Sequence, residues 1–166
     1  MMKISKTICA IVLTATALSS CNHVENQRIP YAPVSIDLTY QSTWAVYGVQ
    51  ALGDYRYFNR AKRLPANFPY TATTYTGFGG VLLIGAGAGD VVPMAFDMAC
   101  PVERAANVAI SIDPNNLDAV CPNCGSHFNV LTGAGMPIKG EALQKNYGLT
   151  RYTALPAATG GYRITN

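Results

Sequence analysis

The chain has 166 residues and a mass of 17.7 kDa, which allows one ordinary domain and leaves little room for a second. With 49% hydrophobic and only 13% charged residues, it has the apolar material for a core and lacks the composition of a disordered chain. The net charge is +3, and it falls to +1 if Lys3 and Lys6 leave with an N-terminal signal. A chain this close to neutral has no long-range field to steer it onto nucleic acid, so no nucleic-acid partner is expected.

Residues 1–20 read as a bacterial export signal, with a basic start followed by the apolar stretch Ile8 to Leu18. The stretch is too short to span a bilayer as a mature helix. It ends in Leu18-Ser19-Ser20-Cys21, which resembles the lipobox of bacterial lipoproteins. The resemblance implies that Cys21 becomes the acylated first residue of a cell-envelope lipoprotein, on the periplasmic or outer-membrane side. An ordinary secretory signal beside an unrelated cysteine is the alternative.

Residues 21–33 are polar, contain two prolines and show no periodicity, which predicts a tether between the lipid and a folded domain over 34–166. The domain opens with apolar residues at every second position, typical of a half-buried strand: Val34, Ile36, Leu38 and Tyr40.

Residues 44–80 interleave basic and aromatic side chains, a pattern that can mark single-stranded nucleic-acid binding. For an exported protein we interpret it as a solvated basic turn beside aromatic strands. The run 80–89 resembles a dinucleotide-binding loop, but β-branched residues and Pro93 follow it and oppose the helix that such a site needs. It predicts a strand, a glycine-rich hairpin and a returning strand over 94–98.

Further strands are expected around 108–112, 128–131 and 162–164, and only residues 141–146 are expected to form a short helix. His23 lies in the predicted tether and is given no role. Trp44 and the tyrosines are interpreted as core or sheet-face residues. Many short strands separated by turns predict an all-β antiparallel sandwich or barrel.

Three cysteines remain if Cys9 leaves with the signal and Cys21 carries lipid: Cys100, Cys121 and Cys124. An odd number argues against a disulfide framework, and for either a metal site or one bridge with a free thiol. Both Cys-Pro pairs are expected on loops at strand ends, which suits metal-binding knuckles that face each other.

Two segments around these cysteines carry a resemblance to a known family: Phe96-Asp-Met-Ala-Cys100-Pro, and Cys121-Pro-Asn-Cys-Gly-Ser-His-Phe-Asn129 with Thr132-Gly133, Pro137 and Gly140 downstream. Over roughly residues 78–166 the chain resembles a Rieske iron–sulfur domain. The resemblance implies a Rieske-like β fold with two cluster-type loops. That family carries C-x-H in one loop and C-x-x-H in the other, whereas Val102 and Cys124 stand at the two histidine positions here. Because a Rieske cluster needs two imidazoles on one iron, an unaltered centre is not expected.

Several chemistries remain open for the three thiols. They could bind zinc or an atypical 2Fe-2S cluster, with Glu103 or His127 as the fourth ligand, although the resemblance places His127 at a non-ligand position. By the same resemblance, Cys100 and Cys121 could close a disulfide and leave Cys124 free. Thiol exchange through Cys121 and Cys124 is disfavoured, because no helix is expected to follow them.

The resemblance gives Ser126 a hydrogen bond to a cluster sulfur; here its expected role is to stabilise the turn after Cys124. No enzyme constellation is apparent in the sequence. We expect a non-enzymatic Rieske-like lipoprotein with an altered cluster site for electron transfer or structure. The alternative is a metal-free, disulfide-closed module of the cell envelope that binds an unknown protein partner.

Overall fold

The computed structural model describes residues 23–87 and 89–166, so the predicted signal and Cys21 lie outside the described residues. Its elements, in chain order, are β1 (Val34–Tyr40), α2 (Gln41–Tyr47), β2 (Tyr55–Phe58), β3 (Tyr75–Thr76), β4 (Val81–Ala86), β5 (Val92–Asp97), β6 (Ser111–Ile112), β7 (Ala119–Val120), β8 (His127–Asn129), β9 (Met136–Lys139), α3 (Glu141–Lys145), β10 (Arg151–Pro156) and β11 (Gly160–Thr165). The prediction of an all-β fold is confirmed. In the part of the chain that the structure describes, no helix is long and apolar enough to cross a membrane.

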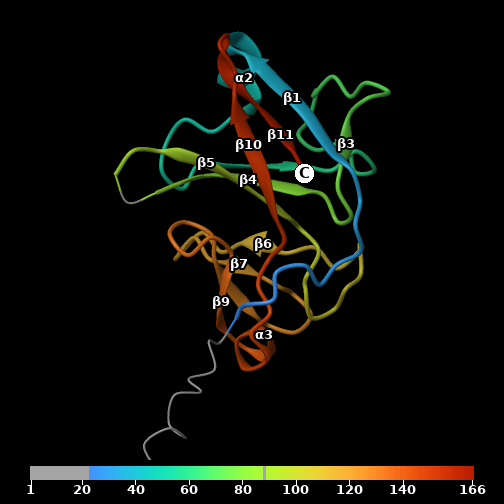
Figure 1. The fold of residues 1–166 in the computed structure, drawn as a ribbon, viewed down its shortest axis with the longest axis vertical. Coiled ribbons are helices and arrows are strands. Elements are labelled where there is room, and N and C mark those ends of the chain that lie inside the picture. Colours follow the sequence, from blue (N-terminus) through green and yellow to red (C-terminus); the bar gives the residue numbers. More distant parts are fainter. Residues whose placement is uncertain (1–22, 88) are drawn as a thin grey trace, which may run out of the picture.

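The strands form two antiparallel sheets. The larger has the order β2-β4-β5-β10-β11-β1-β3 and nearly closes into a barrel. The smaller has the order β6-β7-β8-β9. Figure 1 shows the smaller sheet and α3 gathered at one end of the molecule, with α2 and the β10–β11 hairpin at the other. The long hairpin of β4 and β5 joins the two parts, since the chain passes directly from β5 into the loop before β6.

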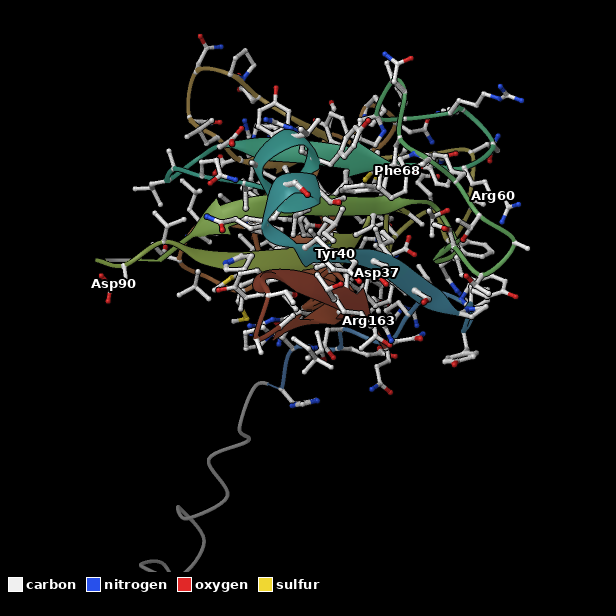
Figure 2. All side chains as sticks on the ribbon, turned by 90° about the horizontal axis from the view of Figure 1, so that it is seen from above. Asp37, Tyr40, Arg60, Phe68, Asp90 and Arg163 are labelled. Atoms are coloured by element: carbon white, nitrogen blue, oxygen red, sulfur yellow. The ribbon has the colours of Figure 1, made fainter. Side chains whose placement is uncertain are left out.

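The two cores lie on opposite faces of β4, which is buried along its whole length. Leu82 and Ile84 pack into the core shared with the smaller sheet, and Val81 and Leu83 pack into the interior of the larger one. Alternate side chains of a strand point to opposite faces, so a strand covered on both sides is apolar throughout. Figure 2 shows Asp90 at the exposed tip of the hairpin that follows β4.

The strand predicted from Val34 and the hairpin predicted after residue 80 are confirmed as β1 and as β4 with β5. The short helix predicted over 141–146 is confirmed as α3. The expectation that no other helix forms is wrong, because Gln41–Tyr47 is helical. Trp44 on this helix is buried, with its ring 4.7 Å from that of Tyr162, so tertiary packing stabilises a turn of helix that carries no side-chain N-cap.

Residues 23–33, the described part of the predicted tether, lie along the domain. Glu25 forms an isolated bridge with Tyr147, and its backbone N–H donates to Asn146 O at 2.9 Å. The guanidinium of Arg28 lies 4.0 Å from the centre of the Tyr147 ring. Because backbone and side-chain contacts both hold this segment, it is part of the fold rather than a spacer.

Candidate metal centre

The two cysteine loops begin where strands end. Cys100 comes three residues after β5, directly after Ala99, which bridges Ala109 across the loop. Cys121 follows β7 without a gap, and the turn that begins there closes on itself as Gly125 N–H donates to Cys121 O and Cys121 N–H donates to Ser126 O, both at 3.0 Å. Gly125 has a φ of +63°, which glycine adopts without strain, so the tight turn between β7 and β8 requires this residue.

The structure brings the three cysteines together. Their Sγ atoms all lie within 4.8 Å of one another, and those of Cys100 and Cys124 are 3.7 Å apart. All three are free thiols. Cys100 and Cys121 are fully buried, whereas Cys124 is partly exposed, so solvent reaches the group from the Cys124 side.

The thiols differ in their electrostatic surroundings. Burial raises the pKa of Cys100 and Cys121, because desolvation disfavours the thiolate. Burial acts in the same direction on Cys124, but hydrogen bonds from the side chain and backbone of Ser126 prevail, and its pKa is lowered. Cys124 is therefore the thiol that deprotonates most readily.

Ser126 links the cysteine group to α3. Its Oγ lies 3.2 Å from Cys124 Sγ and accepts a hydrogen bond at 3.0 Å from the backbone N–H of Ala142, in the first turn of α3. Gly140 makes this approach possible, since a Cβ there would lie 2.9 Å from the Cα of Ser126. The predicted role of Ser126 in stabilising the turn is thus combined with a contact to α3.

Neither proposed fourth ligand joins the group. Among the described residues, the atoms that could converge on a metal come from the three cysteines alone, without Glu103 or His127. His127 lies on β8 and its Nδ1 is 3.4 Å from a carboxylate oxygen of Asp118. Val102, at one of the positions where the resembled family has histidine, packs against the core.

Asp97, which no sequence motif marks as functional, organises the start of the first cysteine loop. Its carboxyl is fully buried and accepts hydrogen bonds from the backbone N–H groups of Phe78, Gly79 and Ala99, at 2.8, 3.0 and 2.7 Å, and from the Tyr152 hydroxyl at 2.5 Å. Burial raises the pKa of Asp97, and these hydrogen bonds counteract the rise. A carboxylate at the end of a buried strand, three residues before a cysteine, was the available signal.

The donor set suits one soft or borderline metal ion. Zinc binds thiolates at about 2.3 Å with tetrahedral angles, which places two ligating sulfurs roughly 3.8 Å apart. The 3.7 Å between the sulfurs of Cys100 and Cys124 matches this separation, and the sulfur of Cys121 lies within 4.8 Å of both. No family model matches the chain, and the comparison with curated proteins finds no relative.

Proposed function

We propose that the chain is a Rieske-like envelope lipoprotein in which the cluster site has become a site of three thiolates for a single metal ion, with zinc as its occupant. The observation that carries the proposal is the convergence of the Cys100, Cys121 and Cys124 sulfurs within 4.8 Å. Zinc would hold the two loops together at the end of β5 and β7. The proposed role is structural, and an iron-containing form would instead serve electron transfer.

The spacing of the sulfurs favours one ion over a two-iron cluster. Thiolates at the two ends of such a cluster are separated by both irons, so they lie farther apart than thiolates on one ion. Here every pair of sulfurs lies within 4.8 Å, and Val102 offers no donor for a fourth cluster ligand. The remaining position on a tetrahedral zinc would be taken by water or another external donor from the Cys124 side.

The experiment is metal analysis of the mature, processed protein purified without oxygen, followed by replacement of the native metal with cobalt. We expect one zinc per chain, no visible colour, and intense sulfur-to-cobalt absorption after replacement. Cys121→Ser should abolish binding. His127→Ala and Glu103→Gln are the matched controls and should keep the full metal content. Bound iron with acid-labile sulfide would overturn the zinc assignment, and absence of any metal with three titratable thiols would overturn the site.

A disulfide is the second candidate, favoured by the 3.7 Å between the sulfurs of Cys100 and Cys124. This pair differs from the Cys100–Cys121 pair that the resemblance implies, and it would leave Cys121 as the buried free thiol. The protein would then be a metal-free module that binds a partner in the envelope. One titratable thiol in the mature, denatured protein, together with the mass of a peptide linking Cys100 to Cys124, would establish this candidate in place of the metal site.

A further inference from the structure

The chain enters the described fold at the C-terminal end of α3. The carbonyl of His23 accepts a hydrogen bond from Asn146 Nδ2 at 3.1 Å, and Gly148 N–H donates to Glu25 O at 2.9 Å. A Cβ placed on Gly148 would lie 2.8 Å from Val24 Cγ1 and 3.4 Å from Gly135 O, just before β9. Residues 23–25 are therefore fixed beside α3 and the start of β9, at the lower end of the molecule in Figure 1.

Very little chain separates this point from the proposed lipid. Cys21 precedes His23 by two residues, and two residues span at most about 7 Å when fully extended. The headgroup region of one leaflet is roughly 5 to 7 Å thick. A lipid on Cys21 would therefore bring the α3 end of the domain into contact with the headgroups, where a tether of thirteen residues would have allowed it to move away.

This end of the domain exposes apolar side chains. Met136 and Ile138 on β9 are 46% and 43% exposed, and Leu143 on the neighbouring α3 is 50% exposed. Met136 and Ile138 are two residues apart on one strand and so share a face. Two charged groups nearby are paired, since Lys145 lies 2.6 Å from Glu141, and the exposed Lys139 at the end of β9 adds a positive charge beside Ile138.

We propose that Met136, Ile138 and Leu143 form a membrane-facing surface that lies in the headgroup region of a phospholipid bilayer. The inference rests on the proposed lipidation of Cys21. Three half-exposed side chains give little affinity by themselves, but the anchor keeps them at the bilayer surface, so the contact becomes an intramolecular one. The surface orients the domain, and the acyl chains supply the attachment.

The test uses the full-length protein in vesicles of phosphatidylethanolamine and phosphatidylglycerol that contain brominated lipids. Trp44 is buried on α2, far from this surface, so it supplies a constant background. Leu143→Trp places a reporter on the surface. Leu155→Trp is the matched control, because Leu155 is 48% exposed on β10 toward the opposite end. We expect the added emission of Leu143→Trp to be quenched strongly and that of Leu155→Trp to be unaffected.

The mass of the N-terminal peptide separates the two proposals. If Cys21 is acylated and the two reporters are quenched equally, or neither is quenched, the membrane-facing surface is overturned while the lipoprotein assignment stands. If Cys21 carries no acyl chain, the lipoprotein assignment and the inference that rests on it are both overturned. Acylation with selective quenching of Leu143→Trp supports both.

Discussion

The buried carboxyl of Asp97 orders the first cysteine loop. Its two carboxyl oxygens accept hydrogen bonds from three backbone N–H groups and one hydroxyl, drawn from the loop before β4, the loop after β5, and β10. Gly79 is required there, because a Cβ would lie 2.5 Å from the backbone N of Ala99. The carboxyl therefore fixes the backbone that leads into Cys100.

Asp97→Asn should destabilise the protein by about 2 to 4 kcal/mol. The substitution turns one acceptor oxygen into an NH2 donor that faces other donors in a buried site. Urea denaturation measures the change in the free energy of unfolding. Asp90→Asn, at the exposed hairpin tip, is the control and should unfold like the parent. Equal stability of the two variants would show that the hydrogen bonds of Asp97 make no net contribution to the free energy of unfolding.

The ionisation of Asp37 is expected to make the stability of the protein depend weakly on pH. Its pKa is lowered from 3.8, mainly by hydrogen bonds from Thr39 and, to a smaller extent, by Arg163, which lies 3.0 Å away on the neighbouring strand (Figure 2). A lowered pKa in the folded state adds stability that is present above pH 3.8 and lost as the pH falls through the folded value. Because both partners are about half exposed, we expect less than about 1 kcal/mol.

The measurement is the melting temperature of parent and Asp37→Asn as a function of pH. The parent should melt higher at neutral pH, and the two curves should converge in acid. Thr39→Val should reduce the difference more than Arg163→Gln does, following the order of the two contributions. A difference that persists unchanged in acid would point to a cause other than the charge of Asp37.

At the scale of elements, α3 depends on the close approach of Gly140 to Ser126. Gly140 has a φ of +79°, and an added Cβ would lie 2.9 Å from the Cα of Ser126 and 3.1 Å from the carbonyl oxygen of Gly125. We expect Gly140→Ala to cost about 1 to 3 kcal/mol and to weaken cobalt binding. Gly89→Ala is the matched control, since nothing lies within 4 Å of its added Cβ. Both variants are measured by urea denaturation and by cobalt titration. Equal stability and equal cobalt affinity of the two would contradict a link between the Gly140–Ser126 contact and the cysteine group.

Strands with a regular pattern could be predicted from the sequence, and elements that depend on distant partners could not. The alternation from Val34 and the apolar run before Gly85 each determine a strand locally. Gln41–Tyr47 has neither a side-chain cap nor a repeated apolar stripe, and it is helical because Trp44 packs beneath Tyr162, more than a hundred residues away. A local sequence pattern cannot predict contacts between residues so far apart in the chain.

The same distinction holds at the candidate site. The resemblance indicated that the loops of Cys100 and Cys121 meet, because their spacing and glycine positions are local features. It did not indicate that Cys124 would be 3.7 Å from Cys100, or that His127 would turn toward Asp118. These details depend on side-chain rotamers and on the contact between Ser126 and α3, which no short motif specifies.

At the scale of the molecule, the docked segment before β1 changes the expected dynamics. A free tether would exchange its amide hydrogens at unprotected rates, whereas Glu25 N–H is bonded to Asn146 O and Gly148 N–H to Glu25 O. We expect both amides to be protected in native-state hydrogen exchange. Tyr147→Ala, which removes the ring under Arg28, should reduce the protection of Glu25 while leaving β4 unchanged. Rapid exchange at Glu25 in the parent would contradict the docked arrangement.

The helix α3 has only five residues, so it holds the cysteine group close to the point where the chain enters the described fold. One end of the helix contacts Ser126 beside Cys124, and the other holds the carbonyl of His23 through Asn146, about 7.5 Å along the axis. Under the proposed attachment, the sulfur group would sit just above the lipid surface. A membrane-bound molecule that exchanges metal or ligands with it would then meet it by lateral diffusion in two dimensions, and the encounter rate of that pair would depend on surface density rather than on bulk concentration.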